Sequence, residues 1–262
     1  MCPKAVRKKK TQTHSEWSKA RRPLRIVPLH PAARAAATGT PQLTYRGGPL
    51  LSAAEVFTIF WGKAWQAEAN APLMQQMNSF FDFVLTSSLM NQLGEYSTGG
   101  FTIGNGKRIG TLNLVSSEPG STLQDAAIQS MLQKEISAGT LPAKTANSLY
   151  FVFAPPGTQV VDAGSSSCQD FCGYHDATAE GIFYAVMPYP GCSGCEGGLA
   201  LLDALTSTSS HELCEAITDP IPGQGWYDDS FGEIGDICAW KTKNLGNYTV
   251  QLEWSNSAGA CV

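Results

Sequence analysis

The residues best suited to chemistry form a short stretch around one histidine, His211-Glu212-Leu213-Cys214-Glu215. On a helix that turns about 100° per residue, Glu215 lies about 40° around the axis from His211, on the same face. Two ligands at this spacing can bind one metal ion, and the glutamate that follows the first ligand can reach a water molecule on that ion. The HExxE pattern therefore predicts a hydrolytic metal site with His211 and Glu215 as ligands and Glu212 as general base.

A third protein ligand is expected, because catalytic zinc sites usually have three and leave the fourth position open. The candidates are Asp219, Glu233 and Asp236; we expect Glu233 to bind the metal, with Asp236 or Asp219 supporting, and Asp236 could alternatively orient another ligand. The imidazole favours Zn²⁺, whereas Ca²⁺ is the competing ion for an all-oxygen cluster. A solvent-exposed acidic helix face without an ion is the alternative. No Lys or Arg lies between positions 144 and 241, so we favour a cation among these acids.

Two further side chains near this stretch could take part. His175, in the sequence Cys-Gly-Tyr-His, is a candidate ligand or proton donor. The interpretation we favour is a loop histidine packed beside a disulfide. Cys214 could be a nucleophile with His211 as its base, but its position beside the apolar helix face favours a buried thiol.

The elements that must position these residues alternate between helices and strands. Apolar periodicity and β-branched runs predict three helices and four strands, and Gly104-Asn105-Gly106 predicts a hairpin. This alternation is typical of an α/β (α+β) fold in one domain, with a mixed sheet and a long active-site helix. The expected helices are 72–92, 122–137 and 199–218; the expected strands are 55–60, 148–153, 182–187 and 248–254; the expected hairpin is 101–115.

Charge divides the chain into two parts. Residues 1–46 hold eleven Lys/Arg and one acid, whereas the rest holds seven and twenty-one, which gives a basic tail on an acidic body. Residues 1–42 lack periodicity and contain five prolines, so we predict a disordered tail at 1–42 and a folded domain at 43–262. A solvated tail is favoured over a nucleic-acid or membrane patch. No apolar run reaches the roughly 18 residues of a membrane span, and no signal-peptide apolar region is visible.

Seven of the eight cysteines lie in the C-terminal half of the chain. Cys168-x3-Cys172 and Cys192-x2-Cys195 are about twenty residues apart. This spacing fits a structural zinc site of four thiolates, and it fits a disulfide framework equally well.

Several of these segments, in order, resemble the EXORDIUM or phosphate-induced protein family. They are YRGGPLL and VFTIFWGK near residue 45, CQDFCGYH at 168–175, CSGC at 192–195, and the helix from LDAL to TDP, followed by Cys238 and Cys261. The resemblance covers residues 43–262. It implies passage through the secretory route, and therefore disulfides at the paired cysteines, with Cys214 left as a free thiol.

Plant members of that family are secreted cell-wall signalling proteins without established catalysis, and they lack the His-Glu pair. This chain shares His211-Glu212 and the Gly-Glu-Ile-Gly-Asp segment with microbial, zincin-like relatives. We therefore expect an extracellular, monomeric, zinc-dependent hydrolase acting on peptide or protein substrates, without nucleic-acid or membrane partners. A non-catalytic extracellular protein of the EXORDIUM type is the alternative.

Overall fold

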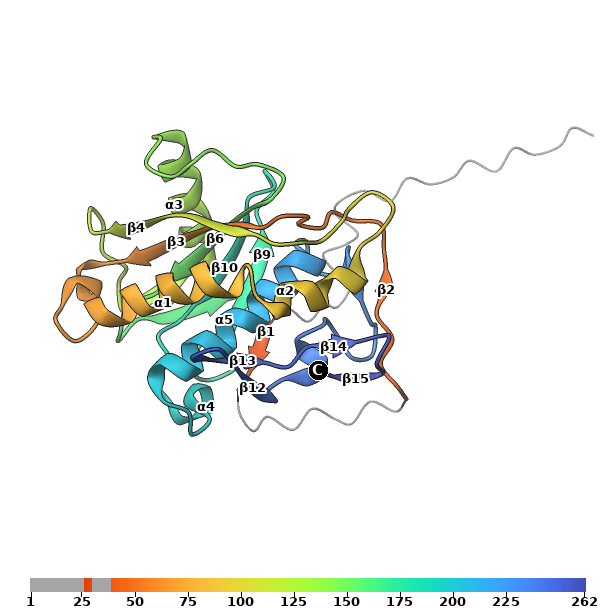
Figure 1. Ribbon diagram of the computed structural model, residues 1–262. Coiled ribbons are helices and arrows are strands. Elements are labelled where there is room, and N and C mark those ends of the chain that lie inside the picture. Colours follow the sequence, from red (N-terminus) through yellow and green to blue (C-terminus); the bar gives the residue numbers. More distant parts are fainter. Residues whose placement is uncertain (1–25, 30–38) are drawn as a thin grey trace, which may run out of the picture.

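A six-stranded mixed sheet forms the centre of the protein, with the strand order β1-β9-β10-β6-β3-β4 (Figure 1). The computed structural model describes residues 26–29 and 39–262. Strands β10, β6, β3 and β4 are parallel, whereas β9 is antiparallel to β10 and β1 is antiparallel to β9. The mixed sheet and its helices confirm the α/β class. The strands are β1 (Ile26–Pro28), β9 (Phe171–Ala177), β10 (Phe183–Met187), β6 (Ser148–Phe153), β3 (Glu55–Trp61) and β4 (Lys107–Leu114).

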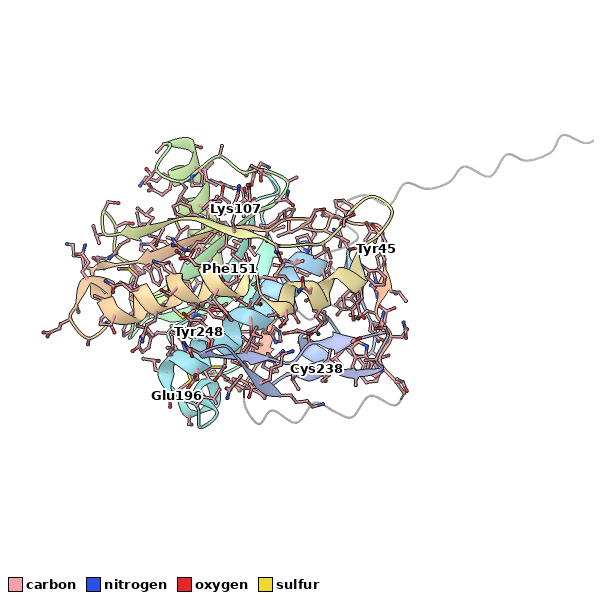
Figure 2. All side chains as sticks on the ribbon, in the orientation of Figure 1. Tyr45, Lys107, Phe151, Glu196, Cys238 and Tyr248 are labelled. Carbon is pink, nitrogen blue, oxygen red and sulfur yellow. A yellow bond between two sulfur atoms is a disulfide. The ribbon has the colours of Figure 1, made fainter. Side chains whose placement is uncertain are left out.

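Helices cover both faces of this sheet. α1 (Ala71–Val84) and α5 (Leu201–Thr218) pack on one face, whereas α3 (Asp125–Ser137) packs on the other. Successive strand residues point to opposite faces, so Phe151 of β6 joins the first core and Tyr150 joins the second. Figure 2 labels Phe151 where α1 crosses the sheet. Every residue of β6 is buried, as expected for a central parallel strand covered on both faces.

The predicted helix over 72–92 is divided in two. α1 ends at Val84, and α2 (Ser88–Leu93) begins after a short break. The Ser87 side chain accepts a hydrogen bond from the Leu89 amide, which caps the new helix. Both halves place apolar residues in the same core, so the apolar pattern continues across a break that the capping serine creates.

The predicted hairpin at 101–115 is wrong. Only its second half is a strand of the sheet, β4, and it pairs in parallel with β3 rather than with the segment before it. The residue just before β4, Gly106, must lack a side chain, because a Cβ there would lie 2.5 Å from the Ala54 carbonyl oxygen. The glycine that indicated a turn therefore permits a close backbone approach.

The remaining predictions hold with shifted boundaries. The helix expected over 122–137 begins at Asp125, because residues 122–124 form β5, which pairs with β7 (Gln159–Asp162). The strand expected over 248–254 divides into two short strands. The other elements are β2 (Thr44–Tyr45), η2 (Lys63–Gln66), η3 (Gly94–Tyr96), β5 (Thr122–Gln124), β8 (Ser165–Ser166), α4 (Ser193–Glu196), β11 (Trp226–Tyr227), η4 (Asp236–Cys238), β12 (Thr242–Leu245), β13 (Tyr248–Gln251), β14 (Trp254–Ser255) and β15 (Ala260–Cys261).

One strand lies inside the range predicted to be a tail. β1 pairs with β9 and places Val27 opposite Gly173, with Val27 1% exposed. The Pro28 carbonyl oxygen accepts a hydrogen bond from the Trp240 indole. The prediction that order begins near residue 43 therefore misses this strand; the rest of the predicted tail, apart from Leu29 and residues 39–42, lies outside the described residues.

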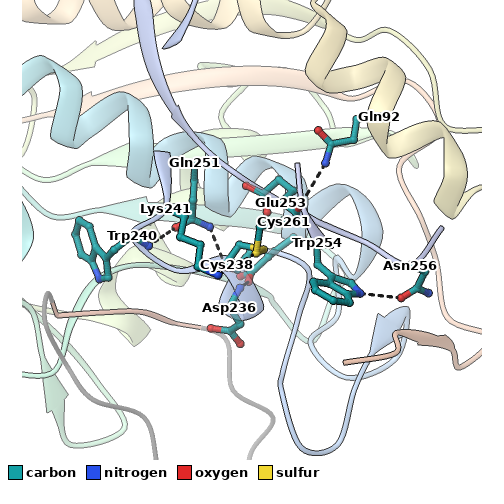
Figure 3. The surroundings of a disulfide bond; sticks show 12 residues. Gln92, Asp236, Cys238, Trp240, Lys241, Gln251, Glu253, Trp254, Asn256 and Cys261 are labelled. Atoms are coloured by element: carbon teal, nitrogen blue, oxygen red, sulfur yellow. Dashed lines mark hydrogen bonds between the residues drawn. A yellow bond between two sulfur atoms is a disulfide. The ribbon is translucent and has the colours of Figure 1, made fainter. Parts of the chain in front are cut away.

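Three disulfides staple the fold, and they decide between the two interpretations of the cysteines. Cys168 pairs with Cys192, Cys172 with Cys195, and Cys238 with Cys261. The thiolate zinc alternative is therefore wrong in this structure, since paired sulfurs cannot act as thiolate ligands. Figure 3 shows the third disulfide beside Asp236 and Glu253. Within the described residues, no helix combines the length and apolar character needed to cross a membrane.

Candidate metal centre

The helix that carries His211, Glu212 and Glu215 is enclosed on all sides. Every residue of α5 from Ala204 to Thr218 is buried, and His211, Glu212 and Glu215 are each 0% exposed. Strands β9, β10 and β13 and helix α1 pack around it. The alternative of a solvent-exposed acidic face is therefore wrong.

A first group of ligand atoms gathers around His211. Its Nε2 lies 3.0 Å from Oε1 of Glu215, the residue one helical turn later. Asp236 approaches from η4, and its amide donates a hydrogen bond to the same Glu215 oxygen at 3.0 Å. One ligand atom from each of His211, Glu215 and Asp236 lies within 4.8 Å of the others. The structure thus brings three of the predicted ligands together.

A second group gathers around His175, which lies on β9 and is also 0% exposed. Its Nδ1 lies 3.1 Å from Glu212 Oε2 and 3.6 Å from Glu215 Oε2. Its Nε2 lies 3.1 Å from the Asp219 carbonyl oxygen and 3.4 Å from Glu233 Oε1. Of the predicted ligands, Glu233 therefore lies on the His175 side of the cluster.

Many of these buried polar atoms make no hydrogen bond. They include Nδ1 of His211, Oε1 of Glu212, Oε2 of Glu215 and Oε2 of Glu233. Nε2 of His211 and Oε1 of Glu233 also lack a hydrogen bond and face only other members of the cluster, at 3.0 and 3.4 Å. Buried polar groups in folded proteins are almost always satisfied, because an unpaired one costs about 1–3 kcal/mol. Imidazole and carboxylate atoms that converge without hydrogen bonds are suited to a cation, so the donor set fits a divalent metal. Imidazole ligands favour zinc over calcium.

The electrostatics of the metal-free cluster follow from its burial. Burial lowers the pKa of His211, but Glu215 and Glu212 outweigh this effect and raise it from 6.5 to about 10. Burial likewise opposes the charged form of His175, but Glu233 and Glu212 raise its pKa well above its usual value. Burial raises the pKa of Glu212 and of Glu233. Without a metal, the imidazoles therefore carry the protons that partly offset the carboxylates.

The other acids of this region have different tasks. The Asp219 carboxylate accepts hydrogen bonds from the amides of Gly223, Gln224 and Gly225, which closes the turn after α5. Asp229 is exposed and pairs with Arg46 at 2.7 Å. Asp219 therefore holds a loop through its carboxylate and is not among the converging ligand atoms.

Sequence analysis named one further member of the cluster as a candidate and missed another. His175 was a candidate ligand or proton donor, but the favoured interpretation of a loop histidine is wrong, because β9 places it against Glu212. Glu253 is 0% exposed and neither of its carboxylate oxygens makes a hydrogen bond. Burial raises the pKa of Glu253 well above the usual value, which opposes its charged form. Glu253 follows β13 on the segment that packs against α5, and no spacing signal marks it.

One pocket near β9 does not open into this cluster. It encloses about 460 Å³ and is lined by residues that include Asp125, Asp176 and Ile221. Asp176 follows His175 on β9, and neighbouring strand residues point to opposite faces. The cavity therefore lies on the face of β9 away from the histidine.

Comparisons with known proteins identify no family for this chain. No protein-family model matches this chain, and neither a curated protein nor a solved structure matches it.

Proposed function

We propose that this protein is an extracellular zinc-dependent hydrolase of peptide or protein substrates, with zinc bound by His211, Glu215 and Asp236. The observation that supports this proposal is the convergence of these ligand atoms within 4.8 Å in a fully buried cluster. The zincin-like fold and the EXORDIUM resemblance stay predictions alongside it. Three disulfides are consistent with an extracellular protein.

Zinc in such a site supplies a Lewis acid that polarises a carbonyl group and acidifies water. Glu212 would accept the proton of the attacking water and pass it to the leaving amine. Its Oε2 faces His175 at 3.1 Å, whereas its Oε1 has no hydrogen-bond partner and is free to take that proton. Burial raises the pKa of Glu212 toward the pH at which it works, which improves a general base. His175 would position Glu212 in this step.

A substrate must reach a cluster that is closed in this structure. Gly173 of β9 lies against Glu212, because a Cβ at Gly173 would be 3.1 Å from Glu212 Oε1. Val27 of β1 pairs with this glycine. Strand β1 therefore forms part of the wall beside the proposed base, and its displacement is the movement we propose for access.

Complete burial also favours a second candidate, a non-catalytic extracellular protein in which the metal holds α5 against the segment that carries η4. A structural metal site needs no open position and no access for substrate. Metal content alone cannot separate the two candidates, because both require the ion; activity must be measured as well.

The test combines metal analysis with a cleavage assay. Purified protein should contain zinc that is lost in His211→Ala while circular dichroism shows an intact fold. Glu212→Gln should keep the zinc held by His211 but lose casein cleavage, whereas the exposed control Glu68→Gln should keep both. Absence of zinc would refute the proposal. Equal cleavage by Glu212→Gln and the parent would remove Glu212 as base, and zinc without any cleavage would support the structural candidate.

A further inference from the structure

The cluster contains two groups of metal-ligand atoms rather than one. His211, Glu215 and Asp236 form the first group, and His175, Glu212 and Glu215 form the second. In each group, one ligand atom per residue lies within 4.8 Å of the others, and all residues of both groups are buried. Only Glu215 belongs to both groups. Its carboxylate therefore lies between two histidines.

The two oxygens of Glu215 face different histidines. Oε1 lies 3.0 Å from Nε2 of His211, and Oε2 lies 3.6 Å from Nδ1 of His175. Oε2 makes no hydrogen bond although it is fully buried. A carboxylate held in this way can give one oxygen to each of two cations, as in the carboxylate-bridged metal pairs of helical-bundle enzymes.

His175 is held in the orientation that a second ion requires. Its Nε2 lies 3.1 Å from the Asp219 carbonyl oxygen, and Glu233 Oε1 lies 3.4 Å from the same nitrogen. A carbonyl oxygen only accepts hydrogen bonds, so it fixes the proton on Nε2. The Nδ1 lone pair then points toward Glu212 and Glu215. Metal-bound histidines usually have such a partner on the other ring nitrogen.

The acidic charge of the cluster also favours a second ion. Glu212, Glu215, Glu233 and Asp236 contribute four negative charges when ionised, and Glu253 beside them is a fifth buried carboxyl group. Histidines that bind a metal are neutral, so they offset none of these charges. One divalent cation would offset two of these four charges, whereas two cations would offset all four. Buried charge without a counter-charge is strongly unfavourable, so the second ion is favoured.

We propose that the cluster binds two divalent cations that share the carboxylate of Glu215, with His175 and Glu212 completing the second site. This inference rests on the proposed zinc function and adds a metal to it. It changes the role of Glu212, which becomes a ligand of the second ion. The single-ion proposal has zinc retained in Glu212→Gln, whereas the two-ion proposal has half of it lost.

The experiment measures bound metal per chain. The full-length protein is stripped with chelator, dialysed against Zn²⁺ and analysed by mass spectrometry of the metal. We expect two zinc ions in the parent and in the exposed control Glu68→Gln, one in His175→Ala, one in His211→Ala, and fewer than one in Glu215→Ala. Loading with Mn²⁺ should give the electron paramagnetic resonance signal of a coupled pair, which His175→Ala should abolish. Where an alanine variant fails to fold, His175→Gln and Glu215→Gln replace it.

The outcomes separate the two proposals. One zinc that His211→Ala removes and His175→Ala retains would overturn the second site and leave the proposed function intact. Two zinc ions retained in Glu215→Ala would overturn the shared carboxylate. Absence of zinc from the reconstituted parent would overturn both proposals.

Discussion

Metal-free protein should become less stable as the pH rises, because His211 is protonated in the folded cluster. Its pKa is raised from 6.5 to about 10. A raised folded-state pKa contributes stability that is fully present below the unfolded value and is lost as the pH rises through the folded value. Between pH 6.5 and 8.5 the unfolded chain releases this proton and the folded protein keeps it. Once the unfolded histidine is neutral, this difference in bound protons lowers the free energy of unfolding by about 1.4 kcal/mol for each pH unit.

The sign follows from the fact that deprotonation of the unfolded state favours unfolding. Integrated from pH 6.5 to 8.5, the loss is about 2 kcal/mol. This is the contribution of His211 alone. The pKa values of His175 and Glu233 are also raised well above their usual values, so both residues act in the same direction. The pKa of Glu215 is lowered: burial opposes this, but His211 outweighs burial. Its contribution is present above its unfolded value of 4.5 and is therefore constant in this window.

Thermal unfolding in EDTA, followed by tryptophan fluorescence at pH 6.5, 7.5 and 8.5, measures this loss. For a domain of this size, about 2 kcal/mol corresponds to a fall in Tm of roughly 4–8 °C. His211→Gln cannot gain the proton and should make the slope shallower than in the parent. With zinc bound the trend should reverse, because the ligands must be deprotonated to bind. Metal-free protein as stable at pH 8.5 as at pH 6.5, or an unchanged slope in His211→Gln, would refute the reasoning.

Three further predictions concern the wall of the cluster and its thiol. Gly235→Ala would bring a Cβ to 2.9 Å from the His211 ring. Zinc affinity should therefore fall about tenfold or more in a competition titration, with the fold retained. Unchanged affinity would show that the ring can move. Val27→Asp places a charge at a buried position of β1 and should therefore accelerate zinc loss to EDTA at least about tenfold. The control Ile109→Asp, at an exposed position of the opposite edge strand β4, should leave this rate unchanged. Equal rates in the two variants would exclude β1 from the wall. Burial raises the pKa of the Cys214 thiol well above its usual value, so Ellman's reagent should react with it only after denaturation. The native parent and native Cys214→Ser should therefore give equal thiol counts, and the denatured variant should give one thiol fewer than the denatured parent. A lower native count in Cys214→Ser than in the parent would contradict the burial of this thiol.

Local periodicity predicted single helices and strands, but it did not predict which segments pair with one another. The helix that carries His211 was placed within two residues of its observed start, because its apolar stripe and Pro220 define it. The hairpin at 101–115 failed because parallel pairing of β4 with β3 joins segments about fifty residues apart. A glycine such as Gly106 need not mark a turn. Here a residue without a side chain is required because the Ala54 carbonyl oxygen lies so close.

The sequence could likewise predict only those site residues that lie on one helix. Helical spacing fixes His211, Glu212 and Glu215 relative to one another, and the structure keeps that relation. His175 reaches them only through the register of β9 on β10, where it pairs with Ala185. Its face on the strand is set by tertiary pairing, so neither its spacing nor its neighbours could place it. The burial of the acidic face of α5 could not be predicted from the sequence either, because charged residues are normally exposed to solvent.

Access to the cluster decides between a catalytic and a structural metal. The ligand atoms are equally suited to both, and so is the charge balance, since a structural ion offsets carboxylates as well as a catalytic one. The difference lies in the wall. Val27 pairs with Gly173 beside Glu212, and Pro28 accepts a hydrogen bond from Trp240, two residues from Cys238 in η4. Strand β1 thus joins β9 to the segment that carries Asp236. If its displacement exposes Glu212, a peptide can replace it on the edge of β9 by the same backbone hydrogen bonds. A hydrolase then requires β1 to open, whereas a structural site requires it to stay.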